Sequence, residues 1–224
     1  VFGVLGAVSI WFSHSSVFVL AGLGISLAFL GLAERQWERI GSLAMTYSLW
    51  VMSFAACYFI SLRHLAGNKN LSNYFSFAFV PHPLLSVSAM EWLLDTFFEM
   101  FKNPGGLELS GLASFTFVVG CISMVSQKRG TFLMLMSPVG ITLLAAGFHK
   151  YPFAGRLILF LVPAFLLFIA EGVEHIRSNI KTEAHLVAVC LIGLLMLHPV
   201  LNSTYHLLKP RVREEIKPVM SHIK

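Results

Sequence analysis

Long apolar blocks alternate with short polar stretches along most of this sequence. A helix needs roughly 17–25 predominantly apolar residues to cross the hydrocarbon core of a bilayer. Six blocks reach or approach that length, and they cover residues 17–33, 41–62, 111–126, 131–148, 157–173 and 186–200. The apolar residues fill these blocks instead of forming one stripe, which is typical of membrane spans. The pattern predicts an all-α, polytopic transmembrane bundle with six full spans.

The N-terminal apolar stretch, residues 1–12, is too short to cross a membrane alone. The small polar residues Ser13 to Ser16 interrupt it and favour a turn or a helix cap. We therefore expect residues 1–12 to be the end of a truncated span and the chain to be a piece of a longer protein. No charged segment precedes the apolar residues from Val1 onwards, so a signal peptide is not expected.

The connection between the second and third spans, residues 64–107, is long, and connections of this length are usually functional or partly structured. Within it, residues 86–102 predict a helix that lies on the membrane surface. Bulky residues such as Trp92 and Phe97 supply its apolar side.

Three carboxylates recur every four residues on this predicted surface helix, at Glu91, Asp95 and Glu99. This spacing places them on one face. Carboxylates so arranged can hold a divalent cation, but the spacing fits no recognised metal motif. The sequence therefore favours a solvated polar face over a metal site, and no cofactor is expected.

The composition agrees with a membrane protein, because 56% of the 224 residues are hydrophobic, only 12% are charged, and the mean hydropathy is +0.75. Soluble domains usually carry about twice that charged fraction. The net charge of +5 arises from short loops and the C-terminal tail. Basic residues beside apolar spans meet lipid headgroups, so we expect membrane lipid and no nucleic acid as a partner. The three cysteines fall in different apolar blocks and predict neither a disulfide framework nor a metal site.

The junction between the fourth and fifth spans, residues 149–156, combines a turn with positive charge. Pro152 and Gly155 forbid a continuous helix, so the chain must reverse here. Arg156 stands at the start of the next span, where a guanidinium can either anchor the helix at the interface or bind a phosphate. Pro163 lies seven residues further on, and we expect it to bend the fifth span.

This junction resembles the polyprenyl-phosphate-sugar-dependent membrane glycosyltransferases of the GT-C type, which include protein mannosyltransferases and aminoarabinose transferases. The resemblance rests on a compact loop that ends in Arg156, an apolar helix with Pro163, and the closing Ala170-Glu171-Gly172. Residues 213–220 also resemble the start of the soluble domain that follows the last span in the bacterial branch. A weaker match lies between Trp11 and Gly22. The similarity covers about the C-terminal half of such a membrane domain.

The resemblance implies transfer of a sugar from a lipid-linked donor to an acceptor on the outer side of a bacterial inner or plasma membrane. Arg156, Lys150 and Tyr151 would bind the donor phosphate. The family's catalytic carboxylate lies in a loop after the first span, which has no counterpart here, so no catalytic residue is assigned and the fragment is expected to be inactive. Residues 1–208 would belong to the membrane domain and residues 209–224 would begin a soluble segment.

The resemblance also sets the orientation, with the long connection, the Arg156 loop and the tail outside. Lys and Arg alone do not decide it, because the two sets of loops carry nearly equal numbers. Two other functions remain open: a non-catalytic scaffold subunit, or a lipid or solute transporter. The spans are almost free of charge, which disfavours ion-coupled transport and leaves the scaffold role open.

Overall fold

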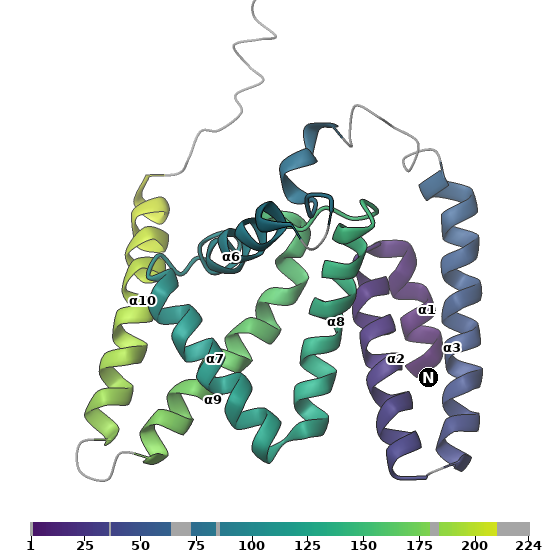
Figure 1. Cartoon of the computed structure of the whole chain (residues 1–224), viewed down its shortest axis with the longest axis horizontal. Helices are drawn as coiled ribbons and strands as arrows, with labels where there is room; N and C mark the ends of the chain where they lie inside the picture. The colour runs from purple at the N-terminus through teal and green to yellow at the C-terminus, as the bar shows by residue number, and fades with distance from the viewer. Residues whose placement is uncertain (1, 36, 64–72, 84–85, 180–183, 210–224) are drawn as a thin grey trace, which may run out of the picture.

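The computed structural model describes residues 2–35, 37–63, 73–83, 86–179 and 184–209. The described residues form helices and connecting turns, with no strand among them. The α-helices are α1 (Phe2–Phe12), α2 (Ser16–Ala33), α3 (Trp37–Cys57), α6 (Val87–Lys102), α7 (Ser110–Gln127), α8 (Arg129–Gly147), α9 (Val162–Asn179) and α10 (Ala184–Leu208). A π-helical turn, Tyr58–Leu62, extends α3, and short 3₁₀ segments cover Ser76–Ala78 and Gly155–Leu161. The prediction of an all-α bundle is confirmed (Figure 1).

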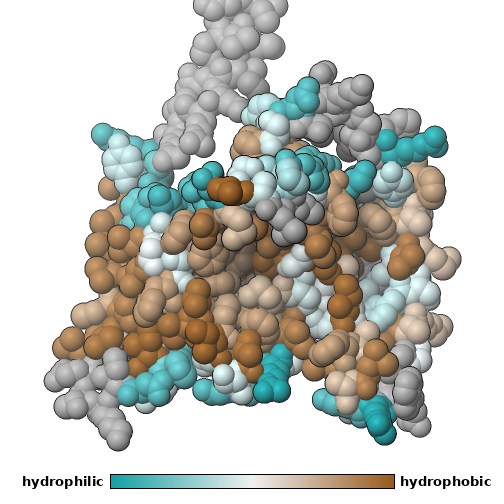
Figure 2. All heavy atoms as spheres, viewed as in Figure 1, coloured by the Kyte–Doolittle hydropathy of each residue, from teal (hydrophilic) through white to brown (hydrophobic). Residues whose placement is uncertain are grey.

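Six helical segments of the described chain are long and apolar enough to cross a membrane, as the sequence predicts. They are Ser16–Ala33, Leu43–Ser61, Ser110–Gln127, Arg129–Gly147, Gly155–Asn179 and Leu186–Leu208. The N-terminal apolar stretch forms the shorter helix α1. An apolar belt crosses the middle of the molecule, and hydrophilic residues collect above and below it (Figure 2). The protein is therefore an integral membrane protein.

The fifth span differs from the prediction in two respects. Pro163 does not interrupt a helix interior, because residues 155–161 form a 3₁₀ segment and Pro163 occupies the first turn of α9. A proline in that position displaces no helical hydrogen bond, since the first N–H groups of a helix have no partner within it. The helix also continues to Asn179, beyond the predicted end of the span at residue 173.

The surface helix predicted at residues 86–102 is present as α6, and it lies across one end of the bundle over α7 and α9 (Figure 1). Ser86 caps it, since its hydroxyl accepts a hydrogen bond from the Ala89 N–H at 3.2 Å. Ala89, Met100 and Phe101 bury its inner face against the spans. We call this end of the bundle the α6 end.

The spans pack as two groups. In the first, α7 crosses α9, with α8 and α10 beside this pair (Figure 1). Buried phenylalanine rings fill the core below α6, with ring centroids between 5.1 and 6.3 Å apart, at Phe101, Phe117, Phe165 and Phe168. In the second group, α1, α2 and α3 pack around Ile10, Leu20 and Trp50.

The contact between α2 and α8 joins the two groups. Ser26 of α2 is buried and donates to the Leu133 carbonyl of α8 at 2.9 Å, and its hydroxyl also contacts that of Ser137. Gly22 lies directly against the ring of Pro138. Small residues let two membrane helices approach closely, and buried hydroxyls hydrogen-bond across the contact.

The long connection and the Arg156 loop meet at the α6 end. The Phe153 N–H donates to the Ala78 carbonyl at 2.8 Å, which ties residues 73–83 to the junction between α8 and α9. The turns at 34–35 and 127–129 lie at the opposite end (Figure 1). Among the described residues, the long connection and the Arg156 loop thus lie at one end of the bundle and these two turns lie at the other. Residues 64–72 of the connection and residues 210–224 of the tail lie outside the described residues.

Cysteine labelling in intact cells should report this arrangement. In a variant without the natural cysteines, Asn73→Cys and Lys150→Cys should react with a membrane-impermeant maleimide from one side, and Gln127→Cys only from the other. All three positions are exposed. Opposite labelling of Asn73→Cys and Lys150→Cys would contradict the arrangement.

Candidate functional site

A cavity of about 680 Å³ opens at the α6 end, between α6 and the start of the fifth span. Five aromatic side chains line it: Phe75, Phe77, Trp92, Phe98 and Phe153. Four charged side chains line it as well: Asp95, Glu99, Lys102 and Arg156. The lining includes residues 155–158, which begin a helical segment long and apolar enough to cross a membrane, and lipid headgroups lie where such a segment begins.

Backbone contacts hold the two walls together. The Trp92 indole N–H of α6 donates to the Phe77 carbonyl at 2.8 Å. The Phe153 N–H donates to the next carbonyl, that of Ala78. Gly155 adopts a left-handed φ of 48°, which glycine reaches without steric cost, and the chain turns there to place Arg156 in the cavity.

Arg156 is exposed and forms no ion pair within the described part of the chain. Its predicted companions are placed differently. Lys150 is exposed but does not line the cavity. The Tyr151 hydroxyl donates to the Leu157 carbonyl at 2.8 Å, and its ring packs on Phe18 with centroids 4.5 Å apart. Of the three predicted phosphate ligands, only Arg156 lines the cavity.

The Tyr151 side chain stabilises the turn that precedes Arg156. Its hydroxyl spans the loop from Tyr151 to Leu157 and so fixes the residue next to Arg156. Burial raises the pKa of the Tyr151 hydroxyl, so the phenol stays neutral and keeps donating this hydrogen bond at physiological pH.

Lys102 is the second cation of the cavity, and sequence reasoning missed it. It lies at the end of α6, far from Arg156 in the sequence, and only the placement of α6 over the Arg156 loop brings the two to one cavity. No local signal in the sequence could have identified this pairing.

The three carboxylates of α6 are all exposed, as expected for a solvated face, but they separate into two sets. Asp95 and Glu99 line the cavity, whereas Glu91 does not. No group of three or more histidine, cysteine or acidic side chains that could hold a metal ion occurs among the described residues. No ion pair within 4.0 Å joins the cavity's acidic side chains to Lys102 or Arg156 in the described structure.

A histidine pair also connects the two loops near the cavity. His82 Nε2 lies 3.1 Å from His149 Nδ1, and the two rings stack with centroids 4.7 Å apart. Phe79 stacks on His149 from the same connection. This contact adds a side-chain link between the long connection and the Arg156 loop to the backbone link at Phe153.

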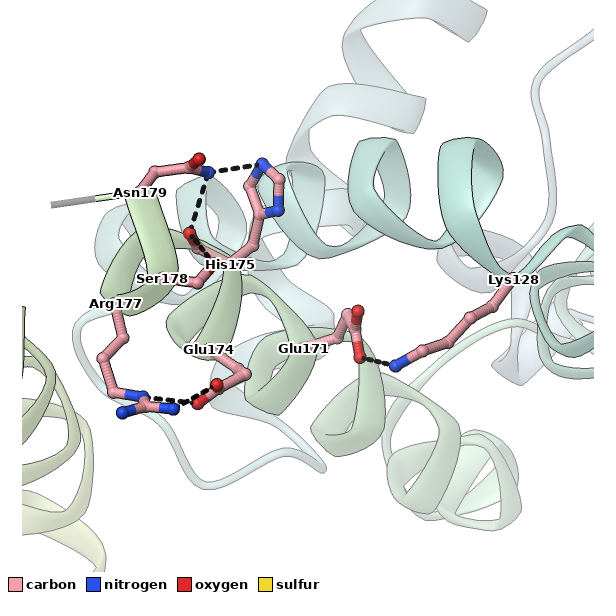
Figure 3. Close-up of polar contacts among 7 residues, drawn as sticks. All are labelled: Lys128, Glu171, Glu174, His175, Arg177, Ser178 and Asn179. Carbon is pink, nitrogen blue, oxygen red and sulfur yellow. Dashed lines mark hydrogen bonds and ion pairs between the residues drawn. The ribbon is translucent and has the colours of Figure 1, made fainter.

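The opposite end carries a separate polar cluster, shown in Figure 3. Glu171 of α9 accepts hydrogen bonds from Lys128 Nζ at 2.8 Å and from the Ser123 hydroxyl at 3.1 Å. Glu174 pairs with Arg177 one turn later. These contacts connect α9 to the turn between α7 and α8 and support the last turns of α9, so the extension beyond residue 173 has a local cause. We assign this cluster a structural role.

No protein-family profile matches the chain, and no curated protein or solved structure is significantly similar to it.

Proposed function

We propose that the chain is the donor-binding part of a membrane glycosyltransferase that uses a polyprenyl-phosphate-linked sugar. The observation that carries the proposal is the placement of Arg156: an exposed guanidinium, without an ion pair among the described residues, that lines a large cavity at the start of the fifth candidate span. A lipid-linked phosphate lies at the same depth, so the phosphate can reach Arg156 while its isoprenoid chain stays in the membrane.

The proposed contact is a charge-assisted hydrogen bond between the Arg156 guanidinium and the donor phosphate. The guanidinium fork can bond two phosphate oxygens at once, which an ammonium cannot. Lys102 adds a second positive charge in the same cavity. As the sugar–phosphate bond breaks, negative charge grows on the leaving phosphate, and fixed cations stabilise that charge.

The remaining walls suit the rest of such a donor. Aromatic rings such as Trp92 and Phe75 offer flat apolar faces to the C–H groups of a sugar. Leu157 and Ile158 lead from the cavity into the apolar fifth span, along which an isoprenoid chain can lie. The proposal includes a bacterial plasma membrane with the α6 end outside; a scaffold or transporter role has no comparable observation in its favour.

Binding of undecaprenyl phosphate to the purified protein tests the proposed contact. A charge-assisted hydrogen bond contributes about 1.5–3 kcal/mol, so Arg156→Ala should weaken binding by about tenfold or more. Arg156→Lys keeps the charge but loses the fork, and we expect an intermediate loss. Lys150→Gln removes a neighbouring charge outside the cavity and serves as the matched control, with no loss expected.

Transfer of a sugar from an undecaprenyl-phosphate-linked donor can be measured in membranes from cells that express the full-length protein. The transfer rate should fall most in Arg156→Ala, less in Arg156→Lys, and not in Lys150→Gln. An interfacial anchor would behave otherwise, because lysine reaches the interface as well as arginine does. Wild-type binding and transfer for Arg156→Lys would favour the anchor, and wild-type values for Arg156→Ala would overturn the proposed phosphate contact.

A further inference from the structure

The cavity at the α6 end is lined by charged side chains of both signs. Asp95 and Glu99 lie one turn apart on α6, and Lys102 and Arg156 supply two positive charges. The four formal charges cancel, yet no ion pair within 4.0 Å joins the acidic to the basic side chains in the described structure. A ligand with one anionic and one cationic group can pair with the basic and the acidic side chains at the same time.

Aromatic side chains line the cavity together with Asp95 and Glu99, and this limits the kinds of cationic group that a ligand can place there. Trp92 precedes Asp95 by one turn of α6, and Phe98 precedes Glu99 directly. A carboxylate accepts strong hydrogen bonds from a primary ammonium. Aromatic faces attract the same cation through their quadrupoles. An uncharged or anionic headgroup would leave both carboxylates without such a partner.

The position of the cavity relative to the membrane limits the class of ligand further. The cavity lies where the fifth span begins, at the level of the phospholipid headgroups. A phosphoethanolamine headgroup carries a phosphate and a primary ammonium two carbons apart, and bilayers present it at this depth. Its size is well within a cavity of about 680 Å³.

We propose that the cavity binds the headgroup of a phosphatidylethanolamine-type lipid, with its phosphate at Arg156 and Lys102 and its ammonium at Asp95 and Glu99. The inference rests on the proposed function only in assigning a phosphate to Arg156. A bound bilayer lipid would occupy the cavity when no donor is present, and the donor would displace it.

Lipid retention by the purified protein tests this inference. The protein is equilibrated in mixed micelles with equal amounts of dioleoyl phosphatidylethanolamine and dioleoyl phosphatidylglycerol, and bound lipid is counted by native mass spectrometry. We expect a preference for phosphatidylethanolamine of about tenfold, the effect of roughly one added charge-assisted contact. Phosphatidylcholine, which has no N–H group, should bind less well than phosphatidylethanolamine.

Variants assign the preference to the cavity. Asp95→Asn with Glu99→Gln should abolish the preference, because both carboxylate charges are lost while the shapes remain. Glu91→Gln removes the same charge from the same helix outside the cavity and should keep the preference. Size-exclusion profiles and thermal unfolding should stay at wild-type values in both, since all three side chains are exposed.

Equal retention of the two lipids by the wild-type protein would overturn the inference, as would an equal loss in Glu91→Gln. The two binding experiments distinguish failure of the lipid inference from failure of the proposed function. If undecaprenyl phosphate binds through Arg156 but phosphatidylethanolamine is not preferred, only the lipid inference falls. If phosphatidylethanolamine is preferred but undecaprenyl phosphate does not bind, the proposed function falls and the lipid inference stands.

Discussion

Replacing Gly172 with alanine should prevent α7 and α9 from packing at their crossing and should unfold this part of the bundle. A Cβ at Gly172 would lie 1.9 Å from the Thr116 carbonyl oxygen, and a Cβ at Gly120 would lie 1.8 Å from the Phe168 carbonyl oxygen. The obstructing atoms belong to the backbone, so no side-chain rotation can relieve the contact. The two helices would have to separate, which would also open the phenylalanine core below α6.

We expect a loss of about 3 kcal/mol or more in the free energy of unfolding, at or above the upper end of the overpacking range. Thermal unfolding of the protein in detergent, followed by size-exclusion chromatography, measures it. Gly140→Ala and Gly193→Ala are the matched controls, since a Cβ at either position meets no atom within 4 Å. A wild-type unfolding temperature for Gly172→Ala would contradict the close crossing of α7 and α9.

The spans could be predicted because their cause is local. The thickness of the hydrocarbon core fixes the length of an apolar helix, and the sequence carries this length directly. The form of residues 155–161 could not be predicted in the same way. A 3₁₀ segment and an α-helix have the same apolar composition, so the sequence predicted Pro163 inside one continuous helix, whereas the structure places it in the first turn of α9.

Of the three residues that the resemblance assigned to the donor phosphate, only Arg156 lines the cavity. Arg156 could be identified because a charged residue at the start of a span must face the membrane surface or a cavity. Lys150 and Tyr151 lie close to Arg156 in the sequence, but Lys150 does not line the cavity and the Tyr151 hydroxyl donates to the Leu157 carbonyl. Lys102 reaches the cavity through tertiary packing, which residue spacing cannot reveal.

The same distinction applies to α6. The four-residue spacing of its carboxylates indicates one face of a helix, but it does not say what that face meets. The structure turns Asp95 and Glu99 toward the Arg156 loop and leaves Glu91 beyond the cavity. Carboxylates that line the cavity and a carboxylate outside it therefore occur on one helix, and residue spacing alone does not distinguish them.

Replacing Gly22 with valine should separate the two groups of spans without unfolding either. A Cβ at Gly22 would lie 2.5 Å from the Pro138 nitrogen and 2.6 Å from its Cδ, and the proline ring cannot rotate away. Separation would also leave the buried Ser26 hydroxyl without its partners on α8. We expect a loss of at least about 2 kcal/mol from the contact between α2 and α8.

A disulfide between the two groups measures this separation directly. In a background without the natural cysteines, Ser26→Cys and Ser137→Cys should cross-link readily, because the two hydroxyls are in contact. Adding Gly22→Val should lower the cross-linked fraction severalfold, whereas Gly140→Val on α8 should leave it unchanged. The phenylalanine core of α7 and α9 does not involve α2, so it should stay packed in Gly22→Val, whereas the Tyr151 ring would lose its contact with Phe18 of α2. Undiminished cross-linking in that variant would show that α2 and α8 are not held together through Gly22.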